Sequence, residues 1–329
     1  MGDALTVSAI LVTWNSAPYL RRCLEGVNAQ THPPLELIVV DNASTDGSVE
    51  LVASLVPDAH IIRNDTNRGF SAAVNQALAI ARGEFALFIN PDAYLDPQYI
   101  ARVLAAFDEA GEEYGSATGK LFRGDGTEIK PTKVIDSLGI RMTRSGRHFD
   151  IAQGEVDREP QAGWREVFGA SGAAAVHRMV MLRDVADVGS AGGEILDEDF
   201  FTYREDADLA WRARLRGWRA LVAFDAVALH VRTVTPAKRG ELSAAVNMHG
   251  VKNRFLLRLK NEGAYLALRN APFELARDLV AIGAVLTIER TSLPGLMWVW
   301  RNRKRVLAKR RVIQARRKVS DRDLAHWFE

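Results

Sequence analysis

The stretch Phe88–Leu95, FINPDAYL, ends an apolar run and places a single carboxylate, Asp92, directly after it. The run itself, Glu84–Ile89 (EFALFI), has the length and apolar character of a buried β-strand. A strand that stops at one acid either simply ends there or holds that acid at the edge of a sheet. The segments that precede this stretch favour the second interpretation.

The first hundred residues alternate short apolar runs with segments of helical spacing. We expect strands at Val7–Thr13, Leu35–Val40, His60–Arg63 and Glu84–Ile89, and helices at Ser16–Ala29, Ser48–Leu55 and Ser71–Ala81. This alternation indicates βαβ units, and therefore an α/β fold with a mostly parallel sheet flanked by helices. Ligands of such sheets bind beyond the carboxyl ends of the strands.

Polar residues follow each of the four expected strands. They lie at Thr13–Ser16, Asp41–Gly47, Asn64–Gly69 and Asn90–Asp92. Because parallel strands end at the same edge of a sheet, Asp or Asn side chains from all four loops can line one pocket. Such a pocket offers the hydrogen-bonding groups that a sugar nucleotide requires.

Three acids, Glu205, Asp206 and Asp208, begin a helical apolar pattern that ends at Gly217. Acids at a helix N-terminus are stabilised by the helix dipole, by about 0.3–1 kcal/mol each. That explanation suits one or two acids better than three, because like charges repel. Crowded carboxylates raise one another's pKa, which suits a general base that works near neutral pH. Helix stabilisation and catalysis both remain open at this point.

The C-terminal segment 301–318 carries ten Lys or Arg and no acid, so the net charge of +2 leaves −8 for the rest of the chain. Two apolar runs precede it, Leu279–Ile288 and Leu293–Trp300, and each is shorter than the roughly 20 residues that span a bilayer. This pattern predicts that residues 236–329 form a helical, basic region that lies on an anionic membrane surface. The alternative is a helical hairpin packed on the body, with a solvated basic face.

Loop-like segments, the single cysteine and the lack of other catalytic motifs further limit the kinds of protein that this sequence can encode. Residues 141–164 lose periodicity and predict a long loop, and Gly189–Gly193 predicts a hinge. The single cysteine, Cys23, excludes an internal disulfide and favours a reducing compartment. No GxSxG, HExxH or paired-cysteine zinc pattern points to a different reaction.

Five ordered motifs resemble those of the family 2 glycosyltransferases, and in particular their rhamnosyltransferase branch. They are Thr13–Asn15, Asp41–Asp46, Asn67–Asn75, Asn90–Ala93 and Glu205–Leu209. The resemblance implies a GT-A fold over residues 1–235. Within it, about residues 5–120 would bind the nucleotide sugar and residues 121–235 would face the acceptor.

For the donor, the resemblance implies a role for each matching residue. Asp41 would bind the base and ribose, assisted by Thr13, Asn15 and Asn42, while Asn67, Gly69, Asn75 and Asn90 would line the nucleotide and sugar pocket. Asp92 would hold Mg²⁺ or Mn²⁺ on the pyrophosphate. Many relatives carry a second acid where this chain has Asn90, so His230 is expected to complete the metal site.

For the transfer itself, the resemblance implies an inverting displacement with a single base. Asp206 is the favoured base, with Glu205 beside it and Asp208 as the alternate. Segment 168–173, with Gly169, Ser171 and Gly172, would face the acceptor.

The motif variants resemble enzymes that move L-rhamnose from dTDP-L-rhamnose to N-acetylglucosaminyl-diphospho-polyprenol in actinobacterial cell-wall linker assembly. The implied partners are a nucleotide sugar, a lipid-linked acceptor and the inner face of the cell membrane, where a cytoplasmic peripheral enzyme would meet its acceptor. Homo-oligomers are possible and nucleic acid is not expected. The alternatives are another donor, such as UDP-galactofuranose or a UDP-hexose, a soluble or protein acceptor, or a protein that only binds its ligand.

Overall fold

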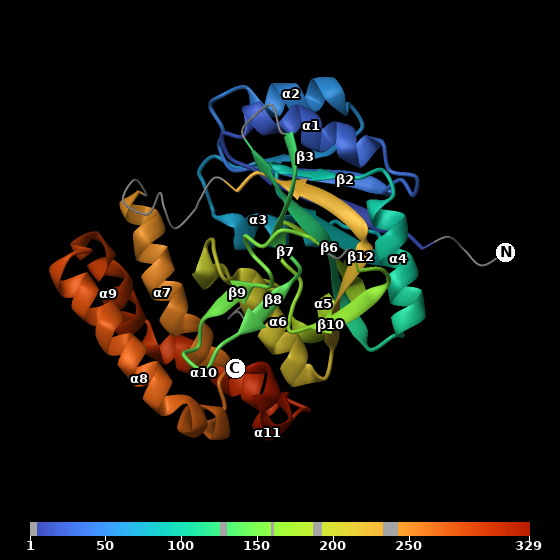
Figure 1. Ribbon diagram of the computed structural model, residues 1–329. Coiled ribbons are helices and arrows are strands. Elements are labelled where there is room, and N and C mark those ends of the chain that lie inside the picture. The colour runs from blue at the N-terminus through green and yellow to red at the C-terminus, as the bar shows by residue number, and fades with distance from the viewer. Residues whose placement is uncertain (1–4, 126–129, 159–160, 187–192, 233–242) are drawn as a thin grey trace.

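The structure is a computed structural model that describes residues 5–125, 130–158, 161–186, 193–232 and 243–329. A central sheet with helices on both faces forms its main body (Figure 1). The first part alternates as expected, with β1 (Val7–Thr13), α1 (Ala17–Asn28), β2 (Glu36–Asp41), α2 (Ser48–Leu55), β3 (His60–Arg63), α3 (Phe70–Leu78) and β4 (Phe85–Ile89). The expected elements are confirmed to within a few residues at their ends.

The sheet is parallel in its first part and mixed overall. β3, β2, β1 and β4 are parallel neighbours, whereas β11 pairs antiparallel with both β4 and β6. β12 runs parallel to β6 and antiparallel to β5 and β10, and β7 pairs antiparallel with β6. The strands of this part are β5 (Ala93–Leu95), β6 (Tyr114–Asp125), β7 (Lys130–Ser137), β10 (Trp164–Val167), β11 (Ala174–Arg178) and β12 (Arg219–His230).

Alternating side chains of the strands build a hydrophobic core on each face of the sheet. On β1, Val7, Ala9 and Leu11 face α1, α2 and α4 (Tyr99–Ala110), while Ile10 and Val12 face the other side. That side is covered by α3, α5 (Met179–Val185) and α6 (Glu205–Arg216), with a short 3-10 helix, η1 (Glu198–Phe200), before α6. Strands covered on both faces are mostly apolar along their length, as Val7–Thr13 is apart from the buried Ser8 and Thr13.

Residues 141–150 do not belong to a long loop as the sequence predicts, whereas the described residues 151–158 and 161–163 contain no helix or strand, apart from one isolated β-bridge at Val156. β8 (Ile140–Met142) and β9 (His148–Asp150) form a hairpin, and β10 begins at Trp164. The turn is closed by the Thr143 N–H, which donates to the Arg147 carbonyl oxygen at 2.8 Å. Strands of three residues are too short to show alternation, so the prediction was wrong here. Residues 189–192, which make up most of the expected hinge Gly189–Gly193, lie outside the described residues.

The C-terminal residues 244–329 form helices that pack on α6. They are α7 (Ala244–Asn261), α8 (Ala264–Thr287), η3 (Arg290–Ser292), α9 (Leu293–Arg301), α10 (Arg303–Ala315), α11 (Asp321–Leu324) and η4 (Ala325–Trp327). Trp211 of α6 shares one hydrophobic core with Leu256 of α7, Val306 of α10 and Phe328. Among the described residues, no helix is both long and apolar enough to cross a membrane.

Buried charges join these helices to the body. Lys260 of α7 is fully buried, and its Nζ contacts carboxylate oxygens of Asp197 and of Asp208, the latter at 3.0 Å. Lys309 of α10 contacts Asp197 and lies 2.8 Å from Asp199. Asp197, Asp199 and Asp208 therefore each have a cation beside them, as the cost of removing a charge from water requires.

Some of the cations in the basic segment 301–318 contact the body of the protein. Besides Lys309, Arg305 lies 2.8 Å from Asp199, and Arg310 donates to the Leu259 carbonyl oxygen at 3.1 Å. Arg316 donates to the Ala186 carbonyl oxygen at 2.6 Å. The cations on the outer side of α10 remain exposed. The segment therefore packs on the body through one side, as the hairpin alternative expects, and presents a solvated basic face on the other.

We predict that Lys260→Met lowers the free energy of unfolding by about 3–5 kcal/mol, because it leaves buried carboxylates without one of their cations. The midpoint of urea unfolding, followed by tryptophan fluorescence, measures the change. Lys304→Met on the exposed side of α10 is the matched control and should shift the free energy by no more than about 0.5 kcal/mol. Equal midpoints for the two variants would show that the buried cluster does not hold the C-terminal helices.

Candidate active site

The loops after β1 and β2 lock together at the carboxyl edge of the sheet. Thr13 lies opposite Asp41 in the parallel register, so both side chains occupy the last position of their strands. The Asn15 N–H donates to Ser44 Oγ at 2.9 Å, and Asn15 Oδ1 accepts from the Thr45 N–H at 2.9 Å. The predicted donor residues of these loops are therefore brought together on a fixed frame.

Two buried polar atoms at this edge lack a hydrogen-bond partner in the described part of the chain. They are Thr13 Oγ1 and Asp41 Oδ1, while the second oxygen of Asp41 accepts from the Ser44 N–H at 3.0 Å. Burying a polar group without a partner is costly, and native proteins rarely do so without a reason. Free acceptors and a hydroxyl at the ends of β1 and β2 suit a ligand that supplies the missing hydrogen bonds.

Other predicted donor residues hold the loops in place. The Asn42 amide donates to the Gly69 carbonyl oxygen at 3.2 Å, and Asn67 Oδ1 accepts from the Gly69 N–H at 2.9 Å. Gly69 has a φ of +83°, and a Cβ there would lie 2.6 Å from the carbonyl oxygen of Phe201. Asn75 donates to the Leu196 carbonyl oxygen at 2.8 Å. The side chains of Asn42, Asn67 and Asn75 thus fix the loops at and near this edge of the sheet.

The structure brings Asp92 and His230 together. Asp92 Oδ1 lies 3.4 Å from His230 Nε2, and the other ring nitrogen, Nδ1, lies 2.8 Å from Asp136 Oδ2. Burial alone would lower the pKa of His230, but hydrogen bonds and negative charge from Asp136 and Asp92 outweigh it and raise the pKa to about 9. Asn90, which follows β4, donates its N–H to the Ala173 carbonyl oxygen at 2.9 Å.

Asp136 was missed by the sequence reasoning. It is fully buried on β7, and Arg232 binds it at 3.0 Å and Asp150 of β9 at 2.6 Å. The Arg232 guanidinium is therefore committed to two carboxylates. A single acid within a strand, such as Asp136, forms no sequence pattern that would predict its contacts with His230 and Arg232.

A histidine and one carboxylate, with a second carboxylate behind the histidine, fit a divalent cation. In metal sites the second ring nitrogen of a ligating histidine usually bonds to a carboxylate, as His230 Nδ1 does to Asp136. The described residues contain no group of three or more His, Cys, Asp or Glu that could hold a metal ion. Asp92 and His230 could thus supply only part of a coordination sphere, the remainder being oxygens of a bound ligand.

The three acids at the start of α6 differ in environment. Asp208 is buried and fully engaged, with Arg212 at 2.8 Å, Lys260 at 3.0 Å and Asn261 at 2.8 Å. These contacts stabilise the packing of α6 on α7 and speak against Asp208 as the alternate base.

Asp206 and Glu205 are half-buried and have elevated pKa values. Burial and the negative charge of Asp150 raise the pKa of Asp206 to about 6. Burial and the charge of Asp206 raise the pKa of Glu205 to about 8. Near neutral pH, Asp206 is then ionised and able to accept a proton, while Glu205 is largely protonated.

The predicted acceptor segment touches Asp206 at one point. The Gly172 N–H donates to Asp206 Oδ2 at 3.3 Å, and a Cβ on Gly172 would lie 3.3 Å from the Asp206 Cβ. Gly169 instead packs on α6, where a Cβ would lie 2.4 Å from that of Ala210. Ser171 is buried. Gly172 thus orients the candidate base, and Gly169 allows β10 and its continuation to approach α6.

A strained turn precedes α6. Phe201, Tyr203 and Arg204 have φ values of 65°, 69° and 72°, a region that side chains larger than glycine rarely adopt. The buried amide of Asn253 on α7 donates to the carbonyl oxygens of Phe200, Thr202 and Tyr203 at 2.8–2.9 Å. A C-terminal helix therefore fixes the turn that places Glu205 and Asp206, and no sequence motif indicated this role.

Comparison with known proteins identifies the family. The model of glycosyl transferase family 2 matches residues 8–181, more than half of the chain. The N-acetylglucosaminyl-diphospho-decaprenol L-rhamnosyltransferase of Mycobacterium tuberculosis is 29% identical over 257 residues, 70% of this chain and 76% of that protein. The putative glycosyltransferase EpsH of Bacillus subtilis is 31% identical over 109 residues, 32% of this chain and 31% of that protein.

Solved structures share the fold. TarS of S. aureus has a TM-score of 0.56 at 18% identity, and the match covers 94% of this chain and 90% of that chain. The mannosyltransferase PcManGT of Pyrobaculum calidifontis, solved with GDP-Man and Mn²⁺, has a TM-score of 0.53 at 21% identity over 95% of this chain and 84% of that chain. Both likenesses support the GT-A-like fold. The chain belongs to glycosyl transferase family 2 and is a hexosyltransferase.

Proposed function

We propose that the protein is an inverting rhamnosyltransferase that moves L-rhamnose from dTDP-L-rhamnose to an N-acetylglucosaminyl-diphospho-polyprenol. The observation that carries the proposal is a chain of polar contacts that ends at a base and at a cation site. It runs from Asp92 through His230, Asp136 and Arg232 to Asp150, whose charge acts on Asp206. The resemblance of the chain to the rhamnosyltransferase of M. tuberculosis supports the choice of sugar and acceptor.

The donor would lie along the carboxyl ends of β1, β2 and β4. Thr13 Oγ1 and Asp41 Oδ1 would gain hydrogen bonds from the base and ribose of the nucleotide, since neither has a partner in the described chain. Asn15 frames this position, and Trp14 beside it is exposed. The sugar would extend toward Gly69 and Asn90. A UDP-sugar donor, such as UDP-galactofuranose, is the alternative that this geometry equally accommodates.

Asp92 and His230 would hold Mg²⁺ or Mn²⁺ against the donor diphosphate, after His230 loses the Nε2 proton that a metal ion replaces. A bound cation would neutralise the charge that develops on the departing diphosphate. Asp136 keeps the imidazole oriented through Nδ1, and Arg232 keeps Asp136 ionised. Two protein ligands leave positions for phosphate oxygens, which explains how one carboxylate could serve where many relatives have two.

In the transfer, the acceptor hydroxyl oxygen forms a bond to the anomeric carbon of rhamnose while the bond from that carbon to the diphosphate oxygen breaks. The hydroxyl proton passes to Asp206, and dTDP leaves with the bonding electron pair. A single displacement inverts the anomeric centre and requires one base opposite the leaving group. Gly172 and the turn held by Asn253 would keep the Asp206 carboxylate in position.

Incubation of the full chain with N-acetylglucosaminyl-diphospho-polyprenol, Mg²⁺ and one of dTDP-L-rhamnose, UDP-galactofuranose, UDP-glucose or GDP-mannose tests the proposal. We expect a deoxyhexose adduct by mass spectrometry from dTDP-L-rhamnose alone, lost with EDTA and restored by Mg²⁺ or Mn²⁺. A soluble N-acetylglucosamine glycoside serves as the second acceptor. Transfer from another donor only, or to the soluble acceptor only, would reject the proposed substrates and leave the family unchanged.

We predict that Asp206→Asn lowers kcat by about 10²–10⁴-fold, because the acceptor proton loses its base, while dTDP binding is retained. For the wild type, kcat/KM should fall as the pH drops through about 6, where Asp206 becomes protonated. Glu205→Gln should keep this acidic limb, and Asp108→Asn on the exposed face of α4 should behave as wild type. If Glu205→Gln loses the fall in kcat/KM at low pH while Asp206→Asn retains activity, Glu205 rather than Asp206 is the base.

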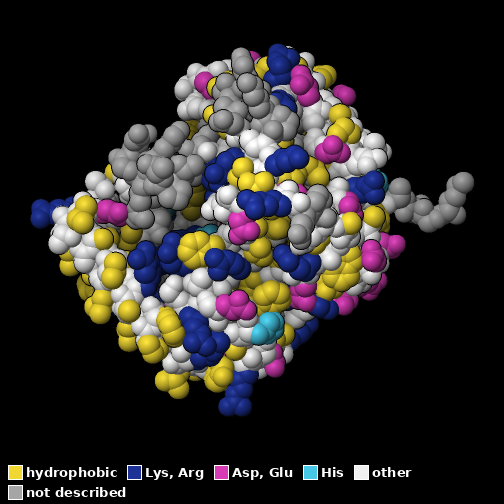
Figure 2. Space-filling model, viewed as in Figure 1, with side chains coloured by type: hydrophobic (Ala, Val, Ile, Leu, Met, Phe, Trp, Pro, Cys, Tyr) yellow, Lys and Arg dark blue, Asp and Glu magenta, His cyan; other side chains and the backbone are white. Residues whose placement is uncertain are grey.

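The membrane-facing surface that we propose is the apolar stripe of α8. Leu268, Leu275, Leu279 and Leu286 are 55–80% exposed, and their spacing of seven, four and seven residues puts them on one side of the helix. Figure 2 shows hydrophobic side chains along the edge of the molecule where Figure 1 places α8 and α9. Exposed Arg and Lys at positions 290, 301, 303 and 304 follow α8 in the sequence. This surface suits peripheral binding to an anionic inner leaflet.

Flotation with phosphatidylglycerol vesicles tests this surface. The wild type should float with the vesicles, and Leu275→Gln/Leu279→Gln should stay in solution, because the variant lacks the side chains that enter the lipid. Val180→Gln on α5, which is similarly exposed, is the control and should float as wild type does. Equal flotation of the double variant and the wild type would show that the α8 stripe is not the membrane contact.

A further inference from the structure

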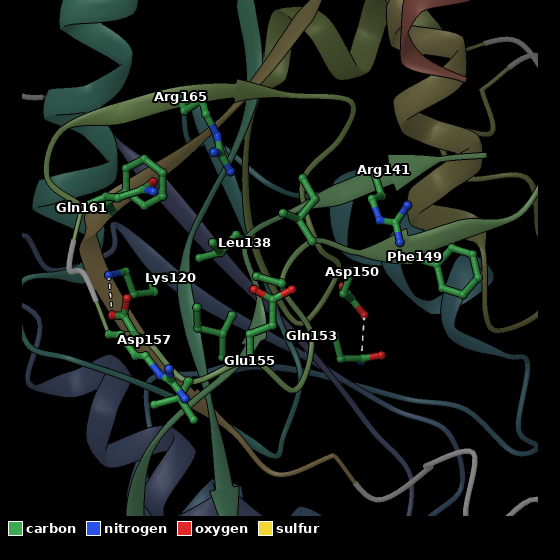
Figure 3. A pocket seen from close by; sticks show the side chains of 16 residues that line it. Lys120, Leu138, Arg141, Phe149, Asp150, Gln153, Glu155, Asp157, Gln161 and Arg165 are labelled. Atoms are coloured by element: carbon green, nitrogen blue, oxygen red, sulfur yellow. Dashed lines mark hydrogen bonds and ion pairs between the residues drawn. The ribbon is translucent and has the colours of Figure 1, made fainter. Parts of the chain in front are cut away.

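A cavity of about 740 Å³ lies between the β8–β9 hairpin with its continuation to residue 158 and the strands β6, β10 and β12. Figure 3 shows Arg165 of β10 extending its guanidinium group toward the space that this cavity occupies, and Arg141 of β8 at another side of it, near Phe149. Asp150 of β9 and Lys120 of β6 lie at other positions around it. None of the predicted site residues lines this space.

The charge of the lining is unbalanced in favour of cations. Lys120 lies 2.8 Å from Asp157, so these two lining groups neutralise each other. Asp150 is neutralised by Arg232, which lies outside the lining. Arg141 and Arg165, with Arg158, have no carboxylate partner within the residues that the structure describes, and Glu155 is the remaining acid of the lining. An excess of arginines that lack ion pairs favours an anionic ligand.

Aromatic rings orient the two arginines without using their N–H groups. The Arg141 guanidinium carbon lies 5.2 Å from the centre of the Phe149 ring, and that of Arg165 lies 5.5 Å from the centre of the Phe224 ring. Stacking of this kind leaves the N–H fork available to phosphate oxygens. Leu138 and Phe224 belong to a hydrophobic cluster that forms the floor of the cavity. The cavity therefore combines a cationic rim with an apolar floor.

Asp150 connects the cavity to the candidate active site. It lines the cavity, binds Arg232 at 2.6 Å, and is close enough to Asp206 to raise the pKa of that carboxyl group. The residues at the strand ends of β1 and β2 do not line the cavity. A ligand in the cavity would therefore reach the candidate base past Asp150 and leave the strand ends to the donor.

We propose that Arg141 and Arg165 bind the diphosphate of the lipid-linked acceptor in this cavity, with the first isoprene unit on the apolar floor. The inference rests on the proposed function, because it assigns the acceptor side of the same reaction. The ligand group that the cavity would bind is a diphosphate joined to an isoprenoid chain. The diphosphate of the donor is the other source of the same anion, and the experiment separates the two.

Kinetics of the variant Arg141→Ala/Arg165→Ala test the assignment. Loss of hydrogen bonds to a charged group predicts that the KM for N-acetylglucosaminyl-diphospho-farnesol rises by about tenfold or more for each arginine, while the KM for the donor stays unchanged. Arg183→Ala on the exposed side of α5 is the matched control and should keep both constants. An unchanged acceptor KM would overturn the inference, and a rise in the donor KM alone would assign the cavity to the donor.

A binding measurement without turnover separates failure of this inference from failure of the proposed function. By titration calorimetry, farnesyl diphosphate should bind the wild type and Arg183→Ala, and should bind the double variant at least tenfold more weakly, whereas farnesol should bind none of them. Equal binding of farnesyl diphosphate by all three proteins would overturn the assignment of the cavity. A third outcome is that the wild type binds farnesyl diphosphate at least tenfold more tightly than the double variant does and yet transfers no sugar to the lipid acceptor. That result would reject the proposed function and still support a diphosphate site in the cavity.

Discussion

The common direction of four strands is the constraint on which the site depends. β1, β2, β3 and β4 run parallel, so their polar loops all lie at one edge of the sheet. Hydrogen bonds between the loops of Asn15 and Ser44 fix that edge before any ligand binds. A fixed edge can keep Thr13 Oγ1 and Asp41 Oδ1 without protein partners, because the surrounding hydrogen bonds and packing offset the cost. The binding groups are thus oriented in advance, which reduces the entropy lost when a nucleotide sugar binds.

The C-terminal helices serve the same site from the other side. Lys260 and Lys309 neutralise buried carboxylates next to α6, and Asn253 holds three carbonyl groups of the strained turn before it. The position of Asp206 therefore depends on residues that lie more than forty positions later in the chain. The basic segment 301–318 has two roles in this arrangement: inward-facing cations complete the protein interior, while the outward-facing ones remain available to an anionic surface.

The sequence allowed the first four strands and the start of α6 to be predicted from periodicity and helix-end composition, while the resemblance to the family implied that Asp92 and His230 would meet. It did not predict Asp136 or Asn253, since each is a single polar residue whose partners are distant in sequence. The β8–β9 hairpin was missed because its strands hold too few residues to alternate visibly. Roles that depend on tertiary contacts, such as the ion pairs of Asp208, require the folded arrangement.

The central claim is that a single carboxylate and a histidine can hold the cation on the donor diphosphate. Anomalous diffraction from crystals of the full chain grown with dTDP and Mn²⁺ tests it most directly. We predict one manganese peak within about 2.0–2.6 Å of Asp92 Oδ1 and His230 Nε2, with diphosphate oxygens completing the coordination. A manganese ion held by other residues, or dTDP bound at the strand ends with no manganese at this pair, would contradict the account.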